Sequence, residues 1–342
     1  MLKGALRLLT AAVLVAGSSW AARAQGPAQP PVQPIELKVS HYLPPNHTVQ
    51  KVLEDWNTEL EARSGGRLKL RLYPAAQLGP VQRQFDLARN GQADMAVGLT
   101  GATPGRYPMT ELASLPFVEP GAGGTSAIMS RRLTELAPKY LQPEFAGLRV
   151  LWVGVQPLSS FFTARKEIGA VSALRGLKIR FQGEQHAKVL RTLGAVPLQV
   201  PPGEIADGMS KGVIDGAVFN YEAAESFGLM SVTQHVMEPP FFTSTLVLVM
   251  NQAKYDGLPP DLRAILDETT GPAAAERFGA SWDVAQQHGR DAMLAAKVGI
   301  NTLPPEEMDK LRTALQPLVA EAASALDKAG KPGSQLLTDY IH

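Results

Sequence analysis

The sequence predicts an α/β fold with parallel sheets, and three observations lead to this prediction. Short alternating or β-branched stretches take turns with stretches of helical apolar spacing, which is typical of parallel α/β architecture. Residues 174–222 have the pattern of a β-α-β-α-β unit. The motif Gly-x-x-Asp-x-Ala-Val occurs at 91–97 and again at 212–218, each time between a helix and a strand. The simplest account is one α/β lobe built twice, with a ligand cleft between the copies. A chance match is the alternative, because a glycine that ends a helix is common.

Composition sets outer limits on the function. The chain has 342 residues, 45% of them hydrophobic, which is enough for two domains with their own cores. Its 33 Lys and Arg nearly balance its 32 Asp and Glu, so no charge pattern favours nucleic acid or an anionic membrane. The chain has no cysteine, which excludes thiolate catalysis and cysteine-bound zinc.

The N-terminus predicts export. A basic start with Lys3 and Arg7, an apolar run at 8–17 and an Ala-x-Ala site ending at Ala24 are typical of a secretory signal peptide, residues 1–24. An uncleaved membrane anchor is the alternative, but the apolar run is well short of the roughly 20 residues that a span needs. No later segment is long and apolar enough to cross a bilayer, so we expect no membrane insertion of the mature chain.

The first half of the mature chain is expected to alternate strands and helices after a disordered leader at 25–34, which is rich in proline and glutamine. Leu68, Leu70 and Leu72 alternate as on one face of a strand, and Gly65 follows the first helical run as a stop signal. This spacing predicts strands at 36–42, 67–73 and 94–98 and helices at 49–60 and 80–90.

The second half is expected to cross between lobes twice. Residues 157–163 are interpreted as a hinge or crossover, and the apolar strand at 243–251 as a return to the first lobe. The spacing also predicts a strand at 148–153 and helices at 126–139, 260–297 (with breaks) and 306–328. The predicted first lobe is 35–156 plus 244–287, and the predicted second lobe is 157–243 plus 288–342.

The sequence specifies no reaction. Residues 208–212 match the Gly-x-Ser-x-Gly pattern of serine hydrolases, but a helix precedes Ser210 and a strand follows it, the reverse of what that chemistry requires. The six histidines are scattered, and no zinc-protease, EF-hand or phosphate-loop motif occurs. We therefore expect no catalytic residue, metal or cofactor.

Two residues stand out as candidate ligand contacts. In open α/β sheets, ligands lie beyond the carboxyl ends of the strands, and Arg180 and Asn220 follow two strands of the central unit. A guanidinium in this place offers a planar, bidentate fork for a carboxylate. A structurally paired or exposed arginine is the alternative. His41, at the end of the first strand, could line the same cleft, or could have an ordinary hydrogen-bonded role.

At this point the chain resembles the extracytoplasmic solute receptors of tripartite ATP-independent periplasmic (TRAP) transporters, the DctP-type family. The resemblance extends from about residue 35 to the last helix, and it rests on the order and spacing of several short stretches. These are Ser-Gly-Gly-Arg-Leu from Ser64, Tyr-Pro-Ala-Ala-Gln-Leu-Gly from Tyr73, the Gly91 motif, Leu-Pro-Phe from Leu115, Leu-Arg-Gly-Leu-Lys-Ile-Arg from Leu174, Gly-Ala-Val-Pro from Gly194, Glu204, Gly-Val-Ile-Asp-Gly from Gly212, Met-Asn from Met250 and Leu-Pro from Leu258.

The resemblance implies a two-lobed periplasmic binding protein fold, with crossing strands and a long helix linking both lobes. It implies a periplasmic location, a small organic acid ligand, TRAP membrane permease subunits as partners and no enzymatic activity. Arg180 matches the family's carboxylate-binding arginine, and Asn220 its ligand-contacting asparagine. The segment 155–163 lacks the second arginine of many sugar-acid receptors, and nearby aromatic residues suggest a monocarboxylate with an apolar or aromatic body.

The sequence therefore predicts a receptor that closes on a carboxylate between two lobes and delivers it to a permease. A secreted α/β enzyme acting on a small carboxylate and a ligand-binding sensor subunit are the alternatives. The predicted ligand contacts are Arg180, Asn220, Tyr221, Glu222, Gln182, Phe181, His41, Tyr42, Phe162 and Phe242.

Overall fold

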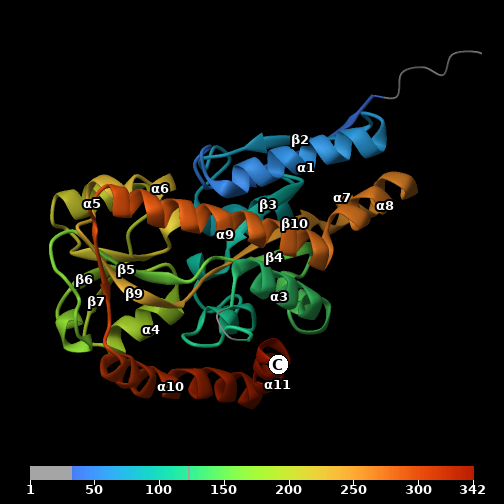
Figure 1. Cartoon of the computed structure of the whole chain (residues 1–342). Helices are drawn as coiled ribbons and strands as arrows, with labels where there is room; N and C mark the ends of the chain where they lie inside the picture. The colour runs from blue at the N-terminus through green and yellow to red at the C-terminus, as the bar shows by residue number, and fades with distance from the viewer. Residues whose placement is uncertain (1–32, 122–123) are drawn as a thin grey trace, which may run out of the picture. The chain divides into compact units, whose positions relative to one another are not determined.

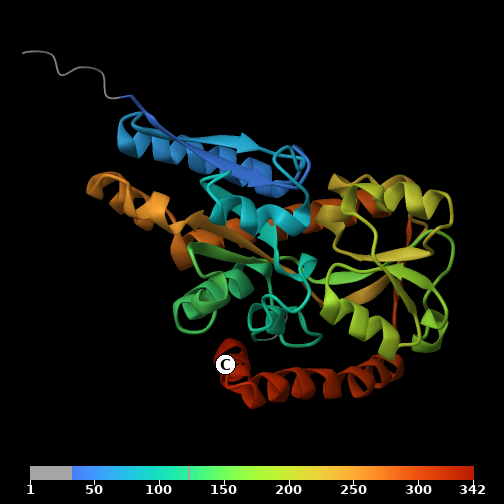
Figure 2. The same cartoon turned by 180° about the vertical axis from the view of Figure 1, so that it is seen from behind.

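The computed structural model of the chain describes residues 33–121 and 124–342. The expected signal peptide, 1–24, lies outside the described residues, as does most of the expected leader, 25–34. In the described part the chain forms two β-sheets with helices packed on them (Figure 1, Figure 2). No helix of this part combines the length and the apolar character that a membrane crossing requires.

The first sheet has five strands in the order β2-β1-β3-β10-β4. β1 is parallel to β2 and β3, whereas β10 is antiparallel to β3 and β4. The strands are β1 (Ile35–His41), β2 (Leu68–Tyr73), β3 (Met95–Leu99), β4 (Leu148–Val155) and β10 (Thr245–Asn251). The helices that pack with them are α1 (Thr48–Ser64), α2 (Gln84–Arg89), α3 (Ser126–Tyr140), α7 (Gln252–Asp256) and α8 (Pro260–Thr269). We call this sheet with its helices the first lobe.

The second sheet has six strands in the order β11-β9-β5-β8-β6-β7. β6 is parallel to β7 and β8, and β5 is antiparallel to β8 and β9. The strands are β5 (Ser159–Thr163), β6 (Lys178–Arg180), β7 (Val196–Leu198), β8 (Gly216–Phe219), β9 (His235–Phe242) and β11 (Gly299–Thr302). With α4 (Glu184–Thr192), α5 (Ile205–Ser210) and α6 (Tyr221–Ser226) this sheet forms the second lobe. The predicted β-α-β-α-β unit is confirmed.

Both sheets are covered on both faces. Successive residues of a strand point to opposite faces of the sheet, and apolar residues at successive positions therefore enter two different cores. In β3, Ala96 belongs to the core on one face of the first sheet and Val97 to the core on the other. In the second sheet, Phe161 and Phe162 of β5 are divided between two cores in the same way. The carboxyl ends of the strands are therefore where polar side chains can gather.

Several segments link the lobes. β4 leads into β5 and β9 into β10, so two strand-to-strand connections cross from one sheet to the other, as expected. The long helix α9 (Gly271–Ala295) contacts α1 and α3 in the first lobe and α6 in the second. Two glycines allow these contacts. A Cβ at Gly279 would lie 2.4 Å from the carbonyl oxygen of Ser126, and a Cβ at Gly289 would lie 2.6 Å from that of Tyr221.

The C-terminal region differs from the expectation. Helix α10 (Pro305–Lys328) ends as expected before Gly330, but the chain then forms a further helix, α11 (Gly333–Ile341). α11 contacts α3, and its buried side chains belong to a core of the first lobe, although 288–342 was expected in the second. The reason is an apolar stripe of Leu336, Leu337 and Tyr340, which buries against the first lobe once the chain has turned at Pro332. The remaining lobe boundaries stay predictions.

Candidate ligand-binding site

Arg180 is a buried cation that forms no ion pair within residues 33–121 and 124–342. It ends β6 with 4% of its surface exposed, and its Nε donates to the carbonyl oxygen of Val200 over 3.3 Å. Its guanidinium carbon lies 5.3 Å from the ring centroid of Phe219. Nη1 is buried and has no hydrogen-bond partner among the described residues. Burial lowers the pKa of Arg180 to about 10, so the group keeps its charge at neutral pH and is suited to bind an anion.

Arg180 lines two adjacent cavities between the lobes. The inner chamber has a volume of about 20 Å³, and the outer cavity has about 320 Å³. Leu99, Arg180, Gln182 and Pro202 line both. The inner chamber is formed from the first lobe by Tyr42, Leu43, His47, Leu99 and Gln156, and from the second by Arg180, Gln182, Pro202, Phe219, Ala223 and Phe227. It is therefore an aromatic and apolar space with one charged group.

The polar atoms that remain available in the inner chamber are donors. His47 accepts from the backbone N–H of Val49 through Nδ1 and faces Glu222 through Nε2. Gln182 accepts from the hydroxyl of Ser244 and donates to a backbone carbonyl. Besides Nη1 of Arg180, the Tyr42 hydroxyl and Nε2 of Gln156 have no partner among the described residues. Burial raises the pKa of Tyr42, so its hydroxyl stays protonated.

Four of the sequence-predicted contacts lie at these cavities. Arg180, Gln182 and Tyr42 line the inner chamber. Phe181 lines the outer cavity, where Gln82, Glu184 and Gln199 add a polar wall.

Asn220 and Tyr221 are engaged elsewhere. Asn220 caps α6 by accepting from the backbone N–H of Ala223 (2.8 Å), and it donates to Oε1 of Gln156 (3.0 Å). Tyr221 donates to Glu238 (2.7 Å), which Arg290 also binds. Neither residue lines either cavity, but Gln156, to which Asn220 donates, lines the inner chamber.

The other predicted contacts are also buried away from the cavities. His41 bonds to Gln50 (2.7 Å), and burial lowers its pKa to about 4. Phe162 packs against Tyr221, and Phe242 packs against His186. Glu222 reaches the other lobe: its Oε1 accepts from the backbone N–H (3.1 Å) and hydroxyl (2.8 Å) of Thr48.

Several chamber residues were missed by sequence reasoning, among them His47, Gln156, Phe219 and Phe227. Phe219 carries the clearest signal, because it directly precedes Asn220 at the end of β8. Gln156 directly follows β4 and His47 directly precedes α1, but nothing local distinguishes them from surface loop residues.

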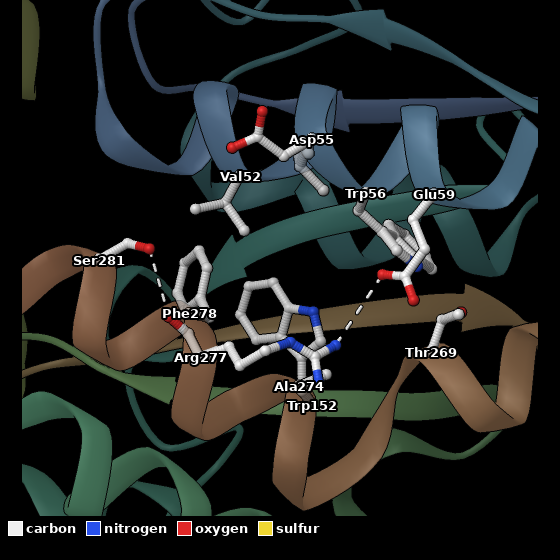
Figure 3. A pocket seen from close by; sticks show the side chains of 11 residues that line it. Val52, Asp55, Trp56, Glu59, Trp152, Thr269, Ala274, Arg277, Phe278 and Ser281 are labelled. Carbon is white, nitrogen blue, oxygen red and sulfur yellow. Dashed lines mark hydrogen bonds and ion pairs between the residues drawn. The ribbon is translucent and has the colours of Figure 1, made fainter. Parts of the chain in front are cut away.

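A separate pocket of about 200 Å³ lies between α1 and α9 (Figure 3). Trp56, Trp152 and Phe278 contribute its aromatic side chains, and Asp55 and Glu59 line it from α1. Its one arginine, Arg277, is 4.0 Å from Glu59 and 61% exposed. Two carboxylates beside one solvated, paired cation make this pocket unfavourable for an anion. No predicted site residue lines it.

Comparison with known proteins identifies the family. The model of the bacterial extracellular solute-binding proteins, family 7 (DctP), matches residues 39–325. This chain belongs to that family. The 2,3-diketo-L-gulonate-binding periplasmic protein YiaO of Escherichia coli is 26% identical over 218 residues, which is 62% of this chain and 64%, less than two thirds, of that protein.

Solved structures of TRAP solute-binding proteins have the same fold. One from Rhodoferax ferrireducens, in complex with benzoate, is 32% identical with a TM-score of 0.85, covering 90% of this chain and 96% of that chain. One from a marine metagenome, specific for aromatic acids and bound to 3-hydroxybenzoate, is 28% identical with a TM-score of 0.85, covering 90% and 97%. One from Bordetella bronchiseptica, with bound mandelate, is 28% identical with a TM-score of 0.83, covering 90% and 98%.

Proposed function

We propose that this family member is a periplasmic receptor for a small monocarboxylate with an aromatic body, which it delivers to a TRAP-type membrane permease. The observation that carries the proposal is Arg180, a nearly fully buried guanidinium with an unpartnered Nη1 at the boundary of two lobes. A buried charge that lacks a partner is costly, and a bound carboxylate would supply both the charge and the hydrogen-bond acceptors.

The inner chamber favours one carboxylate over two. Arg180 is its only charged donor among the described residues, and the Tyr42 hydroxyl and Gln156 amide can add neutral hydrogen bonds to the same anion. The rest of the wall offers ring faces and aliphatic groups, including Phe219, Phe227 and Leu99. Such a wall gains from burying an aromatic ring but leaves the hydroxyls of a sugar acid unpaired. Relatives bound to benzoate, 3-hydroxybenzoate and mandelate support this ligand class.

Binding in this scheme requires the lobes to move. A chamber of about 20 Å³ has room for about one water molecule, far less than an aromatic acid. The ligand would enter while the lobes are apart, pair with Arg180 on the second lobe, and be enclosed when Tyr42 and Leu99 of the first lobe close over it. Closure removes water and so strengthens the ion pair. The permease would then recognise the closed protein.

The test is calorimetry on the chain from Gln25 onward, with benzoate, 3-hydroxybenzoate, mandelate and glucuronate. We expect wild type to bind the aromatic acids and Arg180→Ala to bind at least about a hundredfold more weakly, since the lost charge-assisted bonds contribute about 1.5–3 kcal/mol each. Arg175→Ala, five positions earlier and exposed, is the matched control and should bind as wild type does.

Three outcomes would contradict the proposal. Equal affinity in Arg180→Ala would remove the arginine from the site. Preference for glucuronate would overturn the aromatic class. Chemical conversion of the recovered acid would favour the alternative, a secreted enzyme, since a receptor returns its ligand unchanged.

A further inference from the structure

Glu222 contacts the first lobe from the second. It is 3% exposed and lies in the first turn of α6, directly after Asn220 and Tyr221. Its Oε1 accepts from the backbone N–H and the hydroxyl of Thr48, and its Oε2 lies 3.3 Å from Nε2 of His47. Nearby, Asn46 donates to the carbonyl oxygen of Ser226 over 3.4 Å. We call these contacts of Glu222 and Ser226 with residues 46–48 the clasp.

The clasp satisfies groups that would otherwise be unpaired at the start of α1. The first N–H groups of a helix have no partner inside it, and the helix dipole favours a negative charge there. His47, the residue before α1, already accepts from the N–H of Val49 through Nδ1. Its Nε2 must then carry the proton and donate to Glu222. Burial lowers the pKa of His47, so this neutral form is the one present at neutral pH.

The clasp also forms part of the inner chamber wall. His47 lines the chamber from the first lobe, and Ala223 and Phe227 line it from the second. The His47 and Phe227 rings meet edge to face, with centroids 6.1 Å apart. Each lobe thus supplies one side of the clasp and, within five residues of it, part of the chamber wall.

The lobes touch at a second place. A Cβ at Gly101, which follows β3, would lie 2.9 Å from the Cα of Gly183, which precedes α4, and the reverse distance is the same. The two lobes are therefore in direct contact both at the clasp and here, which is the arrangement that encloses Arg180.

We infer that Glu222 is a positioning residue that holds the closed arrangement, and that it does not bind the ligand itself. This inference rests on the proposed function, because closure matters only if a ligand is enclosed. When the lobes separate, Glu222 and the start of α1 exchange their mutual hydrogen bonds for water. Glu222 therefore shifts the open–closed equilibrium toward the closed form. A larger closed fraction raises the apparent affinity for a ligand that binds the closed form best.

The experiment measures closure and affinity in the same molecules. The chain has no cysteine, so Ala62→Cys on α1 and Lys188→Cys on α4, both exposed, can carry a pair of spin labels. In this background we compare wild type, Glu222→Ala and Glu222→Gln, with and without benzoate. Glu225→Ala is the matched control, because Glu225 is on the same helix but pairs with His288 of α9 and not with the first lobe.

We expect Glu222→Ala to weaken benzoate binding about tenfold or more, the scale of one lost charge-assisted hydrogen bond. The labels should show a smaller closed fraction with and without benzoate, and Glu222→Gln should be intermediate because its amide oxygen can still accept from Thr48. Thr48→Val removes only the hydroxyl that donates to Glu222, so it should weaken binding less. In the Glu222→Ala background, Thr48→Val should have little further effect, because the two substitutions remove the same contact.

Two results would overturn the inference. One is an unchanged label distance and affinity in Glu222→Ala. The other is weaker binding with an unchanged closed fraction in the ligand-free protein, which would make Glu222 a direct ligand contact. Failure of the proposed function would look different: wild type would not bind benzoate, while the ligand-free closed fractions would still report on the clasp.

Discussion

The two lobes contain the same β-α-β-α-β unit. In the first lobe, β1, β2 and β3 are parallel and ordered β2-β1-β3, and in the second, β6, β7 and β8 are parallel and ordered β7-β6-β8. In each sheet an antiparallel strand that belongs to a crossover comes next, β10 beside β3 and β5 beside β8. The repeated Gly-x-x-Asp-x-Ala-Val motif therefore marks equivalent positions of two similar units.

The motif has the same physical role in both units. Gly91 and Gly212 end the preceding helical segment in the left-handed region, at φ 71° and 72°. Asp94 Oδ2 accepts from the backbone N–H of Lys38 over 2.8 Å, and Asp215 Oδ2 accepts from that of Lys178 over 2.8 Å. The aspartate thus ties the start of the third strand of each unit to its first strand.

The units differ where the first strand ends. Two residues after Lys38 is Ser40, whose hydroxyl donates to Gln84 over 2.7 Å inside the first lobe. Two residues after Lys178 is Arg180, with its unpartnered Nη1. The two strands end at equivalent places, with a hydrogen-bonded serine in one lobe and an arginine with an unpartnered nitrogen in the other. In the proposed function, the second lobe thus supplies the charged group of the site and the first lobe covers it.

The largest expected effect comes from removing this difference. Arg180→Met keeps an extended side chain but removes the buried charge, so aromatic acid binding should fall at least about a hundredfold. The free energy of unfolding without ligand should rise by about 1–4 kcal/mol, because a buried charge without a partner is replaced by an apolar group. Ser40→Ala, the equivalent position, should lower it by about 1 kcal/mol and leave binding unchanged. Urea unfolding measures the stability and calorimetry the binding. An Arg180→Met variant less stable than wild type would contradict the interpretation of Arg180 as a buried cation that lacks a partner.

Local patterns were enough to predict the frame. Alternation, helical spacing and glycine stops are properties of neighbouring residues, and they located β6, β8 and the crossovers. Arg180 became a candidate for the same reason, because a charged residue at the end of a strand is visible in the sequence, and the family resemblance favoured it over a structural arginine. α11 was missed because Gly330 and Pro332 are strong stop signals and the apolar stripe beyond them is short.

Partners that are distant in sequence could not be predicted in this way. Glu222 was expected to contact the ligand, yet its partner is Thr48, 174 positions earlier. Asn220 was also expected to contact the ligand, and in the structure it donates to Gln156, 64 positions away. Each side chain is polar, buried and next to the cleft, so its residue type alone is compatible with either role. Only the three-dimensional packing of two lobes distinguishes a ligand contact from a contact between lobes.

Besides His47, each lobe contains one more buried histidine, and these two predict loss of stability in acid. Burial lowers the pKa of His41 in the first lobe and of His186 in the second from 6.5 to about 4. Between these values the unfolded chain binds protons that the folded chain does not, so stability present above pH 6.5 is lost as the pH falls toward 4. Each histidine should account for about 3 kcal/mol of this loss. Glu111, whose pKa burial raises to about 7, acts in the opposite direction, because its contribution is present at low pH and lost as the pH rises through 7.

Urea unfolding at about pH 7 and pH 4.5 tests this balance. His41→Gln and His186→Gln should each reduce the difference in unfolding free energy between the two pH values, by similar amounts if the lobes behave alike. Glu111→Gln is the control of opposite sign and should increase the difference. A pH dependence that neither histidine variant changes would show that other groups control acid unfolding.

The smallest expected effect tests whether the shared frame is also energetically equivalent. Asp94→Ala and Asp215→Ala each remove the acceptor of one backbone N–H that bridges two strands, which should lower the free energy of unfolding by about 1–2 kcal/mol. Asp94 also lies 3.3 Å from Lys254, a partly exposed pair that adds little. Urea unfolding should therefore show nearly equal losses of unfolding free energy in Asp94→Ala and Asp215→Ala. Asp215→Ala should in addition weaken ligand binding, because the strand it ties carries Arg180, whereas Asp94→Ala should not, because its strand carries Ser40. Equal binding losses would mean that both lobes hold the ligand through their first strands, and the division into a binding lobe and a covering lobe would then be wrong.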